Sequence, residues 1–369
     1  MPGEPVSIDR ATADPIPTRR LRNQRISRTS LGTAEQVVDW LGAVQAQEYE
    51  PATWALALRM KGVPVRRDLE DAFEAGRILR THVLRPTWHF VTQEAIRWLL
   101  ELTGPCVQRR MAVYNRQLEL DPPTMTRGAK IFERALRDRQ FLTRSELGEQ
   151  LRRSGVEATG HRLAHLAMHA ELEGVICSGP RRGKQFTYGL IAERAPDARR
   201  LGRDESLAEL ARRYLRSHGP ATVRDFVWWS GLTTADARRG FEACRAASDA
   251  VDGLTYWSVD SPGLGPLREA AAQLLPIYDE YLVAYRDRVV VPHGPSGVTS
   301  ASGRSVIFQH AVVIDGHVAG TWRTFRRSRD LAVTVTPLRR LKREERRALV
   351  NAGERYQRYL ETPVELKID

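Results

Sequence analysis

The order of predicted secondary-structure elements repeats along this chain, and the repeat limits the available folds more than any other feature. Residues 126–190 read as three amphipathic helices followed by a β-hairpin, and residues 204–260 read in the same order. Thr143 and Thr222 occupy equivalent N-cap positions at the start of the second helix. Three helices followed by a hairpin is the winged-helix arrangement, a relative of the helix-turn-helix.

The N-terminal part of the chain can be interpreted in the same way, with residues 78–92 as its hairpin. We therefore predict three tandem winged-helix modules, over residues 19–125, 126–200 and 204–260. Residues 1–18 lack an apolar signal core and are expected to form a disordered lead-in.

After about residue 268 the pattern changes from helices to strands. Four segments alternate in hydrophobicity or are rich in β-branched residues, namely 274–291, 305–315, 317–325 and 331–338. The final segment, 342–361, returns to an amphipathic helix. The predicted fold is therefore mainly α with β: three winged-helix modules plus a β-rich, barrel-like C-terminal domain over residues 268–369.

The charge of the chain points to a polyanionic partner. Fifty-seven Lys and Arg against 45 Asp and Glu give a net charge of +12 and a pI near 10.0. Arginine dominates, and its planar guanidinium suits phosphate contacts, so double-stranded DNA is the simplest partner. A GC-rich genome also inflates arginine, which leaves an ordinary basic protein open as the alternative.

Cysteine usage and hydropathy indicate a cytoplasmic, nucleoid-associated protein. Cys106, Cys177 and Cys244 are far apart and form no CxxC motif, which argues against a disulfide framework or a zinc ribbon. The sequence contains no run of about 18 apolar residues, so no membrane span is expected.

Gln45 and Gln47 are two positions apart where a helix is expected to end. Residues at i and i+2 share one side of an extended chain but not of a helix, so a cooperating pair needs the helix to stop first. Thr33 with Gln36 starts the preceding helix, and Pro51 suits the first turn of the next. The pair is therefore predicted in a short extended connection, with mere decoration of a helix end as the alternative.

Four blocks of sequence, in this order, resemble the AlkZ/YcaQ-like DNA glycosylases: 41–59, 80–91, 170–188 and 274–288. The resemblance covers nearly the whole chain after the N-terminal tail. It implies tandem winged helices plus a β-barrel-like domain, and hydrolysis of the N-glycosidic bond of alkylated purines. Some members of the family unhook interstrand crosslinks.

The family's catalytic signature is a glutamine, an intervening residue, and then glutamine or aspartate. Gln45 and Gln47 match it in the double-glutamine form of the AlkZ branch. Ala46 is smaller than the bulky apolar residue usual between them, which is a departure from the motif. The resemblance implies no cofactor and no metal.

The chemistry of the substrate fits a pair of neutral amides. Glycoside hydrolysis normally needs two carboxylates because the leaving group must be protonated. An N7-alkylguanine or N3-alkyladenine already carries positive charge, so the enzyme only has to orient a water and stabilise a cationic sugar. No lysine nucleophile is needed, and we expect no strand cleavage (lyase) activity. Asp39 and Glu48 are alternative bases close to the pair.

Several other side chains are candidates for contact with DNA. They lie in the first hairpin, at the tip of the second hairpin, and at a C-terminal turn: His82 and Arg85; Arg181, Arg182 and Lys184; Arg323, Arg326 and Arg327. The helical histidines His161, His165 and His169 are expected to form a polar face rather than a metal site. Trp88, Trp228 and Trp229 are expected in the core.

The leading hypothesis is a monofunctional DNA glycosylase for N-alkylated purines, extending to bulky natural-product adducts and crosslinks. Its rival is a winged-helix transcription regulator without catalysis, which would usually dimerise on half-sites. A third hypothesis is a protein that binds damaged DNA but has lost catalysis. Three unequal modules and no heptad dimerisation element favour a monomer.

Overall fold

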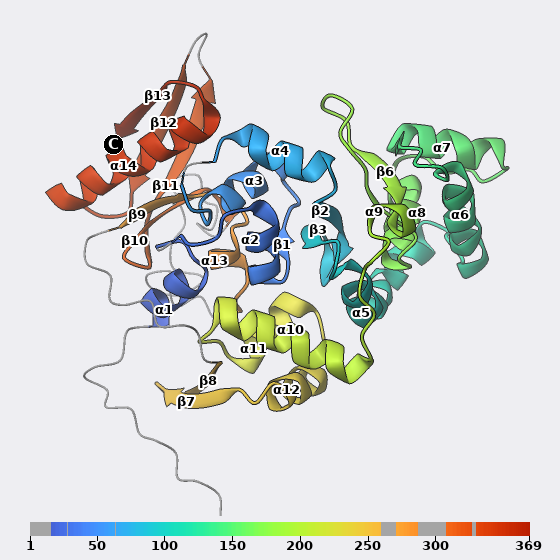
Figure 1. Cartoon of the computed structure of the whole chain (residues 1–369), viewed down its shortest axis with the longest axis horizontal. Coiled ribbons are helices and arrows are strands. Elements are labelled where there is room, and N and C mark those ends of the chain that lie inside the picture. The colour runs from blue at the N-terminus through green and yellow to red at the C-terminus, as the bar shows by residue number, and fades with distance from the viewer. Residues whose placement is uncertain (1–15, 28, 63, 260–270, 287–307, 327–329) are drawn as a thin grey trace, which may run out of the picture.

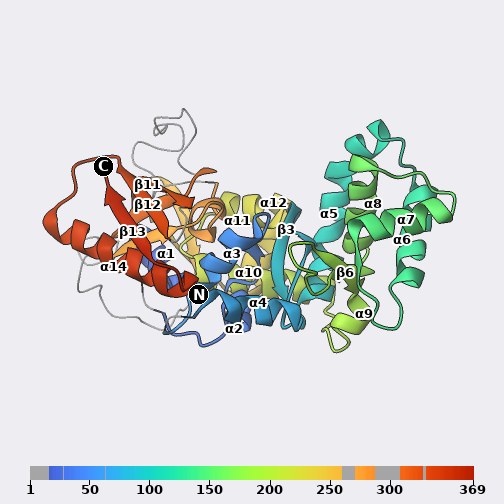
Figure 2. The same ribbon diagram turned by 90° about the horizontal axis from the view of Figure 1, so that it is seen from above.

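A computed structural model describes residues 16–27, 29–62, 64–259, 271–286, 308–326 and 330–369. The chain is a mixed α/β protein whose first segment lies between the other parts (Figures 1 and 2). Helix α1 (Ile16–Asn23) begins inside the expected lead-in, and its Pro17, Arg20 and Leu21 are buried.

The first repeat places Gln45 on a short strand. Its elements are α2 (Ala34–Leu41), β1 (Val44–Gln45), α3 (Tyr49–Ala57), α4 (Arg66–Glu74), β2 (Ile78–Val83) and β3 (Arg85–Thr92). Thr33 caps α2 through the Gln36 N–H, as predicted, and Gly42 ends it with a φ of 82°. Strand β3 lies in the middle of the antiparallel sheet β1-β3-β2.

The long helix α5 (Ile96–Gln117) leads to a second segment with the same order of elements. These are α6 (Pro122–Ala135), β4 (Leu142–Thr143), α7 (Arg144–Arg153), α8 (Gly160–Leu172), β5 (Ile176–Ser178) and β6 (Thr187–Leu190), with α9 (Ile191–Arg194) after them. The sheet order is β4-β6-β5. The predicted capping box of Thr143 and Glu146 starts α7.

The third segment repeats the order with a single bridge in place of the first strand. Its elements are α10 (Arg203–His218), α11 (Val223–Ser230), α12 (Thr234–Ala243), β7 (Ala247–Val251) and β8 (Leu254–Ser258). Ala221 pairs with Trp257 of β8, where the other two segments have a short strand.

The C-terminal segment forms a five-stranded sheet in the order β13-β12-β11-β10-β9. Its elements are β9 (Ala272–Leu275), α13 (Glu280–Val283), β10 (Ala311–Ile314), β11 (His317–Arg326), β12 (Leu331–Pro337), α14 (Arg343–Leu360) and β13 (Val364–Ile368). One expectation was wrong here, and one strand was not predicted. The strand expected over residues 274–291 is interrupted, because the described part of it leaves the sheet after Leu275 and forms the helical turn α13, which Asp279 caps. The unpredicted β13 adds to the sheet parallel to β12.

The hydrophobic cores join these segments around the first one. One core combines α2, α3 and β1 with the C-terminal sheet, and the Trp54 indole donates to the Leu274 carbonyl at 2.8 Å. A second core joins the hairpin β2–β3 and α5 to the third segment. The second segment has a core of its own. The motif Gln45–Gln47 therefore lies where three parts of the chain are packed together.

Candidate functional site

The two glutamines lie on extended backbone after the end of α2, as predicted. Gln45 is in β1 opposite His89 of β3, and the Ala46 N–H donates to the Trp88 carbonyl at 2.7 Å. Ala46 is fully buried in the core, whereas both glutamines are only partly buried. The small side chain of Ala46 thus faces inward between two amides that remain accessible.

Each glutamine is held by contacts from other elements. The Gln45 N–H donates to Glu280 Oε1 at 2.7 Å, and Gln45 Oε1 accepts from Arg85 Nη2 at 2.7 Å. Gln47 Oε1 accepts a longer hydrogen bond, 3.4 Å, from the Trp88 N–H. Among the described residues, neither amide nitrogen has a hydrogen-bond partner, so both stay available to donate to a ligand.

Glu280 is a fully buried carboxylate at the base of this arrangement. Its Oε2 accepts from the Trp229 indole at 2.9 Å and lies 3.5 Å from His218 Nε2. Burial alone would raise the pKa of Glu280, but His218, Arg85 and the Gln45 N–H together lower it to about 2. Glu280 is therefore an anion at neutral pH, directly behind the backbone of Gln45.

Arg85 links Gln45 to the third segment rather than projecting into solvent. Its Nη2 donates to Gln45, and its Nη1 donates to the Trp229 carbonyl at 3.2 Å. Arg85 was expected to contact DNA; two of its nitrogens are hydrogen-bonded within the protein, and a contact with DNA stays a prediction.

His82 was also expected to contact DNA, but its position leaves little surface for such a contact. The side chain is only 4% exposed. Its Nδ1 is hydrogen-bonded to the buried Glu171, and its ring lies against Trp88 with 4.3 Å between centroids. His82 supports Trp88 from the interior and keeps very little exposed surface.

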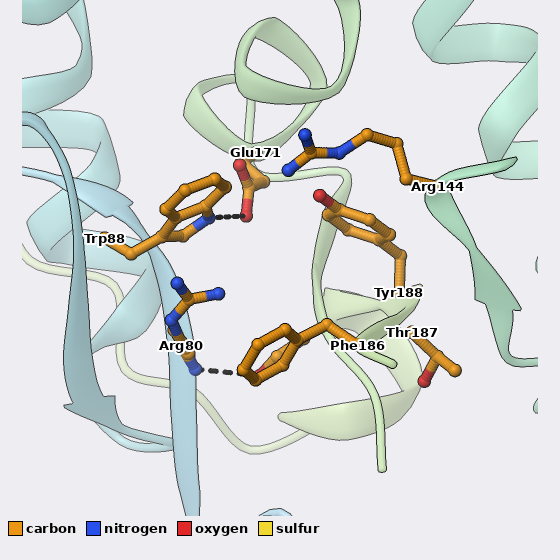
Figure 3. Close-up of a pocket in the computed structure, with 8 residues that line it drawn as sticks. Arg80, Trp88, Arg144, Glu171, Phe186, Thr187 and Tyr188 are labelled. Carbon is orange, nitrogen blue, oxygen red and sulfur yellow. Dashed lines mark hydrogen bonds between the residues drawn. The ribbon is translucent and has the colours of Figure 1, made fainter. Parts of the chain in front are cut away.

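A cavity of about 180 Å³ lies between the hairpin β2–β3 of the first segment and residues of the second segment (Figure 3). Trp88 was expected in the core but is half-buried at the cavity, where its indole donates to Glu171 Oε1 at 3.2 Å. Arg80 lies between the rings of Trp88 and Phe186, at 4.3 and 4.5 Å from their centroids.

Arg80 also fixes the backbone of the glutamine motif. Its Nε donates to the Ala46 carbonyl at 2.9 Å, and its Nη2 lies 3.4 Å from the Gln47 carbonyl. Burial lowers the pKa of Arg80 to about 10, so it remains a cation at neutral pH.

The basic residues at the tip of the second hairpin differ in whether they contact other side chains of the protein. Arg182 forms an ion pair with Glu146 at 2.7 Å, and Arg181 lies 4.8 Å from the centre of the Tyr49 ring. Lys184 is exposed and has no ion pair with a described residue.

Two of the arginines predicted at the C-terminal turn belong to β11, Arg323 within the strand and Arg326 as its last residue. Arg323 and Arg326 are exposed, and Arg323 lies 4.9 Å from the centre of the Phe325 ring. Arg327 is outside the described residues.

The remaining candidates take no part in the arrangement around Gln45. Asp39 forms an ion pair with Arg213 at 2.8 Å and lies 3.9 Å from Arg216, and Glu48 is exposed. His165 Nδ1 is hydrogen-bonded to Asn115 at 2.7 Å, and the described residues contain no group of His, Cys, Asp and Glu arranged to hold a metal. None of the described helices has the length and apolarity that a membrane crossing requires.

The two adjacent tryptophans of α11 have different environments. Trp229 is fully buried, as expected, but Trp228 is 38% exposed, so its expected core position was wrong. Sequence analysis also missed Glu280, because no local pattern connects it to Gln45 across 235 positions. Asp279 beside it forms a buried ion pair with Arg59 at 2.8 Å, which fixes the start of α13.

Comparison with known proteins gives a consistent result. The family model described as "DNA glycosylase AlkZ-like" matches residues 38–359. An "Interstrand DNA cross-link repair glycosylase" of Streptomyces sahachiroi is 28% identical over 353 residues, covering 86% of this chain and 88% of the relative. The solved structure of Streptomyces sahachiroi DNA glycosylase AlkZ has the same fold, with a TM-score of 0.77 and 23% identity over 96% of this chain and 98% of that one.

The family match spans most of the chain and includes the glutamines, Glu280 and the hairpin that holds them. This chain belongs to the AlkZ-like family of DNA glycosylases.

Proposed function

We propose that this protein is a monofunctional glycosylase that hydrolyses the N-glycosidic bond of N7-alkylguanine and N3-alkyladenine in double-stranded DNA. The observation that carries the proposal is the pair Gln45 and Gln47, held on extended backbone with their amide nitrogens available. Family membership supports the reaction class, and the pair supports hydrolysis without a covalent enzyme intermediate.

The proposed roles follow from the chemistry of a cationic leaving base. Because an alkylated purine departs without protonation, the protein needs to place a water and accommodate positive charge on the sugar. Gln45 and Gln47 place the water: an amide nitrogen donates one hydrogen bond to it, and the second lone pair of an amide oxygen accepts one of its protons. The remaining lone pair of the water attacks the sugar carbon as the bond to the base breaks, and the proton passes to solvent. The anionic Glu280 partly offsets the cation Arg85, so the site does not repel a developing positive charge as strongly as Arg85 alone would.

We also propose that the three repeated segments are winged-helix modules that together bind one lesion as a monomer. Their shared order of helices and strands supports this assignment. The excess of basic residues supports binding to the DNA backbone. The similarity to a crosslink-repair glycosylase extends the proposed substrates to bulky adducts and interstrand crosslinks.

The test is the release of free base from duplex DNA containing N7-methylguanine, followed by heat to reveal abasic sites. The proposal expects released 7-methylguanine and strand breaks only after heating. Breaks without heating would contradict the monofunctional mechanism. Tight binding with no released base from methylated or crosslinked DNA would instead favour a regulator or a damage-binding protein.

A further inference from the structure

An exposed tryptophan marks a groove on the third segment that the glutamine chemistry leaves unexplained. Trp228 is 38% exposed, although its indole N–H already donates to the Val283 carbonyl at 2.9 Å. This hydrogen bond fixes the ring, part of which stays exposed. A large aromatic side chain that is held in place at the surface is typical of a binding site rather than of a core.

The groove combines an apolar floor with a basic rim. It has a volume of about 220 Å³ and is lined by Val223, Arg224, Val227, Trp228, Thr234 and Arg286. Arg224 and Arg286 are exposed, and the Arg286 guanidinium lies 5.5 Å from the centre of the Trp228 ring. A phosphate alone would not need the apolar floor, and a neutral apolar ligand would not need two cations. A nucleotide has both a flat base and a phosphate.

The groove is close to the proposed reaction site. Arg85 donates from Nη2 to Gln45 Oε1 and from Nη1 to the carbonyls of Trp229 and Trp228, at 3.2 and 3.5 Å. One guanidinium therefore separates the backbone of Trp228 from the amide of Gln45. A nucleotide bound at Gln45 would therefore have its neighbours in the strand near this part of α11.

We propose that this groove binds the nucleotide next to the lesion, with Trp228 stacking on its base and with Arg224 and Arg286 contacting the flanking phosphates. The inference rests on the proposed function, because it assumes that DNA reaches Gln45. Stacking on the neighbouring base would hold the duplex open beside the lesion. The damaged base then need not rotate into a pocket, a movement that is impossible for a base crosslinked to the opposite strand. Base–aromatic stacking tolerates any sequence, as a repair enzyme requires.

The experiment uses the full chain and a duplex with a tetrahydrofuran abasic analogue, flanked by the fluorescent base 2-aminopurine. Binding of the unaltered protein is expected to quench the 2-aminopurine, because stacking on an indole quenches its emission. Trp228→Ala is expected to lose the quenching and to weaken binding about tenfold. Trp228→Phe keeps a stacking ring but loses the indole N–H, and is expected to retain most of both signals.

Controls separate stacking from a general loss of structure. Tyr114→Ala removes another exposed aromatic ring, on α5, and is expected to leave the quenching unchanged. Arg224→Gln and Arg286→Gln should keep the quenching but should each flatten the dependence of log K on log salt by about 0.9. These variants also keep the inference testable if Trp228→Ala fails to fold.

Two outcomes would overturn the inference. One is normal quenching and affinity in a folded Trp228→Ala variant. The other is a Trp228→Phe variant as weak as Trp228→Ala, which would assign the effect to the bond with Val283. The assay needs no catalysis. Failure of the unaltered protein to release 7-methylguanine would therefore count against the proposed function alone.

Discussion

Glu280 accepts a hydrogen bond from the backbone N–H of Gln45 at 2.7 Å, across 235 positions of sequence. The carboxylate belongs to α13 in the C-terminal segment, whereas Gln45 belongs to the first repeat. This contact makes the position of the proposed catalytic strand depend on a distant part of the chain. It also brings a buried negative charge to the edge of the site.

Glu280→Ala is expected to lower both stability and turnover. It leaves the Trp229 indole and the Gln45 N–H without their acceptor and removes the charge that faces Arg85. Truncating one member of a buried charged network typically costs about 3–5 kcal/mol. Urea denaturation measures the stability, and single-turnover release of 7-methylguanine measures the chemistry.

Glu280→Gln is the matched control, because it keeps an oxygen that can accept from Gln45 but removes the charge. We expect it to recover part of the stability while turnover at saturating DNA remains low. Full turnover in a stable Glu280→Gln variant would show that Glu280 acts only as a structural acceptor.

Gln47→Ala is expected to slow base release about 10²–10³-fold, the order seen when one preorganised polar group is lost. Gln45→Ala should behave similarly, and the double variant should lose less than the product of the two because both hold one water. DNA affinity should hardly change, since phosphate contacts supply most of it. Unaltered turnover in both single variants would remove the pair from the mechanism.

Local signals were sufficient to predict most of the elements around this pair. Thr33 starts the helix before the pair and Pro51 lies in the first turn of the helix after it, so the extended position of Gln45 between them could be predicted from nearby residues. The strand expected over residues 274–291 was wrong because Asp279 caps a short helix there and is itself fixed by the distant Arg59. Residue types alone do not reveal a partner 220 positions away.

The contrast between local signals and distant partners also separates the parts of the site that were predicted from those that were missed. The glutamine motif could be recognised from three consecutive residues, but the contacts that hold it come from Arg80, Arg85 and Glu280 on other elements. Arg85 and His82 were predicted to contact DNA, but the sequence does not show that other segments bury His82 and hydrogen-bond Arg85 to Gln45 and Trp229. Trp228 and Trp229 are neighbours of the same type, and only the packing of α11 shows which one is exposed.

His89 is expected to make stability depend on pH. Burial, and then the charge of Arg85, lowers its pKa to about 3, so it is neutral in the folded protein. The unfolded chain binds a proton near pH 6.5, so this group's contribution is fully present above about pH 6.5. As pH falls from about 6.5 toward 3, the unfolding free energy should fall by up to about 1.4 kcal/mol per pH unit from this residue.

Urea denaturation between about pH 4.5 and 7 checks this dependence, because it covers the upper part of the range in which His89 is protonated in the unfolded chain but not in the folded protein. His89→Gln should flatten the pH dependence relative to the unaltered protein. His317→Gln is the control, because that histidine is exposed on β11 and should leave the dependence unchanged. Equal slopes for His89→Gln and the unaltered protein would contradict the assignment.

The hairpin tip of the second repeat is expected to bind the DNA backbone without regard to damage. Replacing Arg181, Arg182 and Lys184 together by Gln should weaken binding to damaged and undamaged duplexes alike and flatten the salt dependence. Of the single variants, Lys184→Gln should flatten the slope most, by about 0.9, because Arg182 is already paired with Glu146 and Arg181 packs on Tyr49. Anisotropy titrations over a range of salt concentrations measure the slope. A larger effect of Arg182→Gln would show that DNA displaces Glu146.

The arginines at the C-terminal turn are expected to discriminate between large and small lesions. Arg326 is exposed at the end of β11, and Arg327 follows it outside the described residues. A methyl group ends at the purine, whereas a bulky adduct or crosslink extends far enough to meet side chains at the edge of a binding surface. A hydrogen bond from a charged donor to the adduct is worth about 1.5–3 kcal/mol.

The double variant Arg326→Gln and Arg327→Gln should therefore slow release of a bulky adduct about tenfold and leave release of N7-methylguanine within about twofold of the unaltered protein. Arg323→Gln, on the same strand but close to the Phe325 ring, is the matched control and should affect neither lesion strongly. Parallel single-turnover assays on the two lesions measure the ratio, and equal losses on both would show that these arginines bind only the DNA backbone.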